Sequence, residues 1–121
     1  MILQGAYDDL TALRLVKGRA KFSIDFLGRS GRYFDYLSSS GAQPSMAALT
    51  TLAMRVTGIS DIYREDTRRA RQTAILDALA DRLWTEIERR SYADAWRLRR
   101  LPSEPAAQVE QGGGPGTGEF P

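Results

Sequence analysis

Residues 27–37 read Leu-Gly-Arg-Ser-Gly-Arg-Tyr-Phe-Asp-Tyr-Leu, and residues 41–45 read Gly-Ala-Gln-Pro-Ser. Gly28 ends one apolar stretch and Ser30 precedes another, which indicates two short helices joined by a tight turn. Glycine adopts the left-handed backbone at a helix end at little cost, and a serine hydroxyl can cap the helix that follows. Ser45, after a turn-rich loop, is a second expected cap. These signals predict helices over residues 21–27, 31–38 and 46–57.

The sequence on either side of this stretch predicts two amphipathic helices. Apolar residues recur at three- and four-residue spacing over residues 3–17 and 62–90, and the second pattern continues to about residue 100. Gly18 and Gly58 are expected helix ends, and Asp61 is the expected cap of the long helix. No strand-like alternation stands out. We therefore expect an all-α protein, a small helical bundle containing a helix-turn-helix and a long C-terminal helix.

Composition divides the chain into three expected parts. Residues 1–60 form the expected helix-turn-helix domain, and residues 61–100 form a long helix that is a candidate dimerisation element. Residues 101–121 are rich in glycine and proline and contain too few apolar side chains to offset the entropy of the chain. This last part is predicted to be a disordered tail.

The 121 residues include no cysteine and no histidine. Their absence excludes a disulfide framework and the common zinc sites, and it removes the usual general base and the best nucleophile. No phosphate-binding loop, dinucleotide-binding motif or hydrolase motif is present. We therefore expect no catalytic activity, no cofactor and no metal, and no small-molecule substrate is evident.

All 17 basic residues lie in the first hundred residues, where they outnumber the acidic ones by about five. A small basic body suits a polyanionic partner. Only Lys17 and Lys21 are lysines, and arginine binds phosphate and guanine edges more specifically than lysine does. GC-rich coding would also produce this bias. With no secretory signal or membrane-spanning run in the sequence, we expect a cytoplasmic protein without a membrane partner.

Residues 21–56 resemble the lambda-repressor/Cro-like (XRE-type) helix-turn-helix family. One feature departs from the family pattern: Ile24 stands where a small residue is usual, and Ser23 stands where an apolar one is usual. A rotated or shifted second helix, or wider packing of the two helices, would accommodate the departure. The likeness rests on Leu27-Gly28 as the turn, Ser30 to Leu37 as the recognition helix, Gly41 to Ser45 as the loop and Met46 to Val56 as the following helix.

The resemblance implies a sequence-specific transcriptional regulator that binds double-stranded DNA. Its recognition helix, at about residues 30–39, would enter the major groove. Arg32 and Tyr36 are the expected base contacts, and the turn and loop supply expected backbone contacts. The full set of DNA-binding candidates is Arg29, Ser30, Gly31, Arg32, Asp35, Tyr36 and Gln43.

Several alternatives remain open on the sequence alone. A capped helix pair is also a generic way to build a helical bundle, so the scaffold could serve as an adaptor or inhibitor that binds a protein. The apolar stripe of the long helix either joins two copies into a homodimer, which would double the DNA site, or folds back on the first helix of the same chain. The arginines at 64, 68, 69 and 71 either contact phosphates or form a solvated face. The stripe consists of Leu76, Leu79, Leu83, Trp84 and Ile87.

Overall fold

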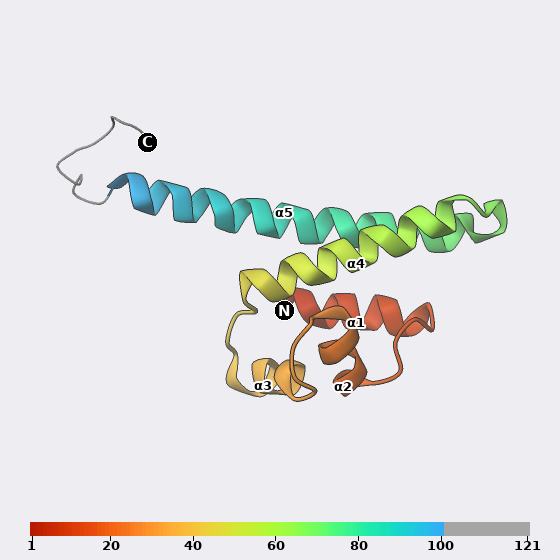
Figure 1. Cartoon of the computed structure of the whole chain (residues 1–121), viewed down its shortest axis with the longest axis horizontal. Coiled ribbons are helices and arrows are strands. Elements are labelled where there is room, and N and C mark those ends of the chain that lie inside the picture. Colours follow the sequence, from red (N-terminus) through yellow and green to blue (C-terminus); the bar gives the residue numbers. More distant parts are fainter. Residues whose placement is uncertain (101–121) are drawn as a thin grey trace. The chain divides into compact units, whose positions relative to one another are not determined.

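The computed structural model describes residues 1–100, with side chains for residues 1–95. Every regular element in that range is a helix, which confirms the all-α class and the long C-terminal helix (Figure 1). The predicted tail at 101–121 lies outside the described residues. The elements are α1 (Ile2–Ala12), α2 (Arg19–Lys21), the π-helix η1 (Phe22–Phe26), α3 (Tyr33–Ser40), α4 (Met46–Arg64), the 3-10 helix η2 (Thr67–Arg69) and α5 (Ala70–Arg100).

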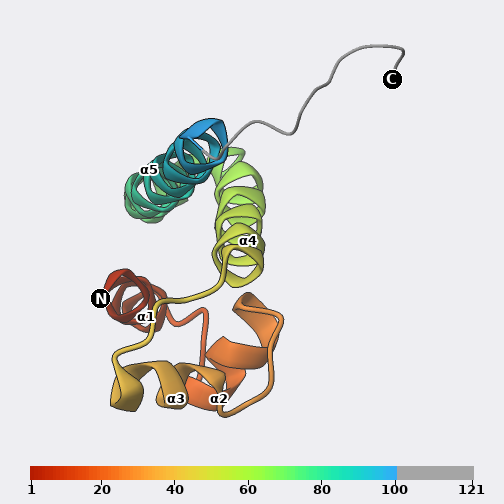
Figure 2. The ribbon, with the colours of Figure 1, turned by 90° about the vertical axis from the view of Figure 1, so that its left-hand side faces the viewer.

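The chain divides into two compact units, Met1–Glu88 and Arg89–Pro121. The described part of the second unit is the continuation of α5 to Arg100, and its side chains from residue 91 to 95 are exposed. In the first unit, α1 and the start of α4 lie over the short helices α2 and α3 (Figure 2). This unit therefore contains the core and both short helices of interest.

The core of the first unit is built mainly from buried apolar side chains of α1, η1, α3, α4 and α5. Phe22 and Phe34 are its largest fully buried side chains. The Tyr7 ring packs against both, with centroid distances of 5.4 and 5.3 Å. In α4, the buried residues Leu49, Leu52, Ala53 and Val56 recur at the three- and four-residue spacing of one helical face.

Helix α1 is shorter than its apolar pattern predicted. It ends at Ala12 because Arg14 takes a left-handed backbone with φ 61°, and the Arg14 N–H donates to the Thr11 carbonyl at 2.9 Å. Val16 is nevertheless buried. The apolar spacing past residue 12 therefore comes from a buried loop residue and not from a continuing helix. Gly18, expected to end this helix, has φ 113° and precedes α2.

Helix α4 is longer than predicted and passes through both Gly58 and Asp61 without a break. An interior glycine costs a helix only about 1 kcal/mol relative to alanine, which tertiary packing outweighs here. The chain reverses instead after Glu65, where the Asp66 carboxylate accepts a hydrogen bond from the Arg68 N–H at 3.0 Å. The cap predicted at Ser45 is confirmed, since its hydroxyl accepts from the Ala48 N–H at 3.1 Å.

A polar cluster joins α4 to α5 along the edge of the core. Arg64 donates to both carboxylate oxygens of Asp77, at 3.1 and 3.0 Å. The buried Ser60 hydroxyl donates to the same carboxylate. The Arg64 hydrogen bond, followed by the Ser60 hydrogen bond, lowers the pKa of Asp77 below its ordinary value of 3.8.

This cluster makes stability depend on pH. Because the pKa of Asp77 is lower in the folded state, its contribution is present above the ordinary pKa and is lost as the pH falls through the folded-state value, below about 4. We expect Asp77→Asn to lower the free energy of unfolding at pH 7. The difference in unfolding free energy between the variant and wild type should become smaller at pH 3. Urea unfolding at both pH values measures this. A gap of the same size at pH 3 would contradict the role of Asp77.

Candidate nucleic-acid interface

The helix before the turn contains the π-helical segment η1 (Phe22–Phe26). The Leu27 N–H donates to the Phe22 carbonyl at 3.1 Å, a bond that spans five residues. The extra residue in this turn leaves Ser23 fully buried and Ile24 half exposed. The small buried residue, Ser23, stands five positions before Gly28.

The turn between the two short helices takes the expected backbone at Gly28, with φ 66°. The Arg29 N–H donates to the Ser23 carbonyl at 2.9 Å. Such a hydrogen bond, between residues six apart in sequence, commonly closes a helix that ends in a left-handed residue. A Cβ atom at Gly28 would lie 3.4 Å from the Thr51 methyl carbon. The turn is therefore held both by its own hydrogen bonds and by the face of α4.

Ser30 does not cap the next helix, contrary to the sequence prediction. Helix α3 begins at Tyr33, and the hydroxyl that serves its first turn is that of Ser23, which accepts from the Phe34 N–H at 3.0 Å. Ser30 contributes only its carbonyl, which accepts from the Tyr33 N–H at 3.1 Å. The sequence suggested a cap at Ser30 because Ser30 closely precedes the helix. The hydrogen bond from Ser23 instead joins two helices, and nothing in the local sequence around α3 indicates it.

Removing the Ser23 hydroxyl is expected to lower the free energy of unfolding more than removing the Ser30 hydroxyl does. Ser23→Ala leaves the buried Phe34 N–H without an acceptor, and an unsatisfied buried donor costs about 1–3 kcal/mol. Ser30→Ala, a matched change at an exposed position, should alter stability by no more than about 0.5 kcal/mol. Chemical denaturation of both variants measures the difference. A larger loss for Ser30→Ala would return the capping role to Ser30.

Helix α3 is anchored to the core through one face. Phe34 is 0% exposed and Leu37 is 2% exposed, so the two residues fix one side of the helix to the core. The Phe34 ring lies 4.9 Å from the Phe22 ring between centroids. Tyr33 adds a link that the sequence did not reveal: its hydroxyl accepts from the Ser45 N–H at 2.9 Å and so ties α3 to the start of α4.

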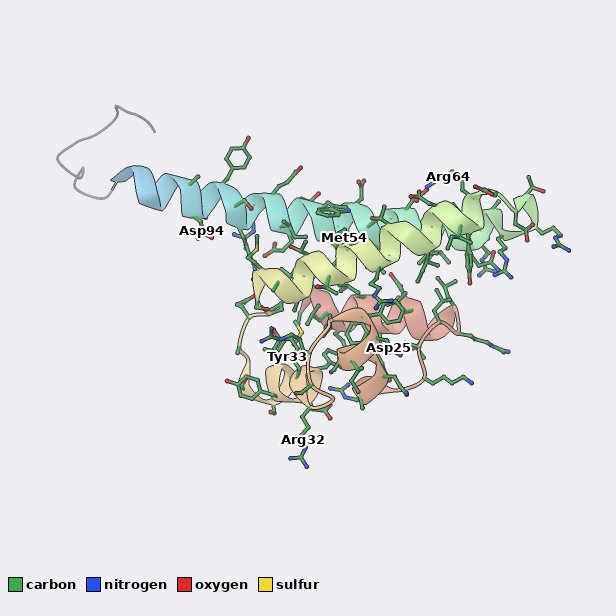
Figure 3. The ribbon with its side chains drawn as sticks, viewed as in Figure 1. Asp25, Arg32, Tyr33, Met54, Arg64 and Asp94 are labelled. Atoms are coloured by element: carbon green, nitrogen blue, oxygen red, sulfur yellow. The ribbon has the colours of Figure 1, made fainter. Side chains whose placement is uncertain are left out.

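The opposite side of α3 carries the residues expected to contact bases. The Arg32 side chain extends away from the rest of the chain (Figure 3). Within residues 1–95 its guanidinium has no hydrogen-bond or ion-pair partner. Tyr36, one turn further on, is 60% exposed. The structure therefore places both expected base contacts on the outer surface of the same short segment.

Asp35 lies on this surface but does not present a free negative charge. It forms an ion pair with Arg19, whose guanidinium also donates to the Ser38 hydroxyl at 3.0 Å. The Arg19 guanidinium carbon lies 4.3 Å from the Phe34 ring centroid. Arg19 is thus a residue of the surface that sequence analysis missed. In the sequence, its only signal is that it lies between two other basic residues, Lys17 and Lys21.

The other DNA-binding candidates occupy the turn and the loop. Arg29 and Ser30 are exposed in the turn, and the Arg29 guanidinium carbon lies 5.1 Å from the Tyr33 ring centroid. Gly31 is half-buried, and a Cβ atom there would lie 3.6 Å from both Ala20 and Ile24 side-chain atoms. Gln43 is exposed in the loop that follows α3 and belongs to neither short helix.

The apolar stripe of α5 folds back on its own chain. Leu76, Leu79 and Leu83 are completely buried in the core, and Ile87 is 8% exposed. Trp84 is partly buried, and its indole N–H donates to the Thr57 hydroxyl at 3.1 Å. These side chains therefore pack into the interior of the first unit. An Arg82–Asp9 ion pair at 2.7 Å adds a link from α5 to α1.

Within the described residues, no helix combines the length and apolar character needed to cross a membrane. Comparison with known proteins finds no match among curated proteins or solved structures. The model of one family, described as a family of unknown function (DUF6626), matches residues 3–97, a range that runs from α1 into α5. The chain therefore belongs to the DUF6626 family.

Proposed function

We propose that this chain is a sequence-specific DNA-binding protein, a transcriptional regulator that places α3 in the major groove of duplex DNA. The observation that carries the proposal is the division of this segment into two sides. Phe34 and Leu37 are buried, whereas Arg32 and Tyr36 are exposed. A groove-reading helix needs this combination, since one side must hold to the scaffold while the other meets base edges.

The charge around α3 also supports the proposal. Between residues 19 and 37 the chain carries four cations and two anions. The charge of Asp35 is offset by its ion pair with Arg19. Phosphate attraction supplies most of the non-specific affinity of DNA-binding proteins. We assign backbone contacts to exposed residues of the turn and loop, which are Arg29, Ser30 and Gln43.

Selection of bound duplexes from a random pool tests the proposal directly. We expect one sequence to be enriched, and Arg32→Ala to weaken binding to it by about 1–3 kcal/mol while relaxing preference at one position. Arg55→Ala is the matched control, because Arg55 is an exposed arginine on α4 with no partner among residues 1–95. Fluorescence anisotropy against salt concentration gives both affinities and their salt slopes.

The alternative is a non-enzymatic module that docks on another protein, and the exposed apolar side chains favour it. Ile24 is 50% exposed and Tyr36 is 60% exposed. A protein-docking surface predicts no enriched sequence, no retention of duplex DNA at low salt and no difference between Arg32→Ala and wild type. Those three results together would overturn DNA binding in favour of an adaptor or inhibitor.

A further inference from the structure

A pocket between the end of α1 and the start of α5 contains two arginines whose charges are not paired within residues 1–95. Its volume is about 310 Å³. No acidic side chain lines it, and neither Arg14 nor Arg71 has a hydrogen-bond or ion-pair partner through its side chain in this part of the chain. The pocket is lined by Ala12, Leu13, Arg14, Arg71, Gln72 and Ile75.

Arg14 has a backbone conformation that is more usual for glycine or asparagine. Its φ of 61° is the left-handed conformation that ends α1, a position where glycine is usual and asparagine is the common exception. The conformation is held by the main chain, since the Leu15 N–H donates to the Leu10 carbonyl at 2.9 Å. Glycine would end the helix at lower conformational cost, so helix termination does not by itself account for an arginine at this position.

Arg71 is also placed where its own helix disfavours it. It lies in the first turn of α5, which contains no acidic residue, and the positive end of a helix dipole repels a cation. Its neighbours in sequence are satisfied: Arg64 pairs with Asp77, and Arg68 and Arg69 both pair with Asp66. Arg71 is the exception within this basic run, and it is the one that lines the pocket.

We propose that this pocket binds a small organic oxyanion, a carboxylate or phosphate ester that carries an apolar group. The two guanidinium groups supply charge and paired donors, and the Gln72 amide supplies a further donor. Partly buried Leu13 and Ile75 supply an apolar wall. The volume lies at the lower end of the range for ligand pockets, about 300–1,000 Å³, which suits a small ligand.

Titration of the full chain followed by amide NMR shifts tests the pocket. The probes are hexanoate and hexyl phosphate, with acetate and inorganic phosphate as charge-only controls and hexanol as an apolar control. We expect one or both six-carbon anions to shift the amides of Arg14, Arg71 and Ile75 and to bind at least tenfold more tightly than every control. Equal binding of the small anions would indicate general ion attraction and overturn the proposal. An absence of shifts at these residues would also overturn it.

Two variants separate binding from folding. Arg71→Gln should weaken the preferred probe at least tenfold. Arg14→Gly should do the same while leaving the midpoint of thermal unfolding unchanged or higher, because glycine adopts the left-handed backbone more readily. Arg55→Gln, at an exposed arginine of α4 outside the pocket, should bind as wild type does. Unchanged affinity in the first two variants would overturn the proposal. This test does not depend on DNA binding.

Discussion

Phe34→Ala is expected to lower the free energy of unfolding by about 3–5 kcal/mol, the usual cost of deleting a buried aromatic ring. Phe34 is fully buried, and its ring packs against Phe22 of η1 and Tyr7 of α1. Its removal leaves a cavity where three segments meet. Since small domains are stable by only about 5–15 kcal/mol, this is a large fraction of the total. Urea unfolding followed by circular dichroism measures the loss.

Tyr36→Ala is the matched control for this change. Tyr36 lies two residues further along the same helix and is 60% exposed, so its truncation should change stability by no more than about 0.5 kcal/mol. If DNA binding is correct, this variant keeps its fold and loses affinity for the selected duplex. Similar destabilisation by both substitutions would mean that α3 is not fixed to the core on one side, and the basis of the proposed function would fail.

The two sides of α3 could be assigned from sequence because helical spacing places residues 34 and 37 together. The same reasoning misplaced the end of α1, where apolar residues continue to Val16 through a non-helical loop. It also stopped α4 at Gly58, although packing against the core carries the helix to Arg64. Apolar periodicity therefore predicted which residues are buried better than it predicted where helices end. Burial is set by the whole fold, whereas helix ends are set by local hydrogen bonds.

The candidate site was predicted in outline but not in its supporting contacts. Exposure of Arg32 and Tyr36 agrees with the expected outer face. The Ser23 cap, the π-helical turn at Phe22–Phe26 and the Arg19–Asp35 ion pair were not predicted. The Ser23 hydrogen bond and the ion pair each join two segments, and the π-helical turn changes which residues of its segment are buried. All three depend on how the segments pack in the fold. A single sequence gives no direct signal for such contacts.

Leu79→Ala is expected to destabilise the folded chain by about 2–5 kcal/mol, because Leu79 is fully buried where α5 packs into the core. The loss is intramolecular in this structure, since the apolar stripe of α5 already fills the interior of its own chain. The midpoint of unfolding should therefore be independent of protein concentration, in both wild type and variant. Thermal unfolding over a hundredfold concentration range measures this together with the destabilisation.

Ile62→Ala provides the control, because Ile62 is a large aliphatic residue that is 71% exposed on α4 and its truncation should have little effect. An obligate pairing of two copies through the α5 stripe would give a midpoint that rises with concentration, since association stabilises only the folded state. It would also require Leu76, Leu79 and Leu83 to leave the core. A concentration-dependent midpoint that disappears in Leu79→Ala, but not in Ile62→Ala, would therefore overturn the single-chain packing of α5 and restore the homodimer predicted through this stripe.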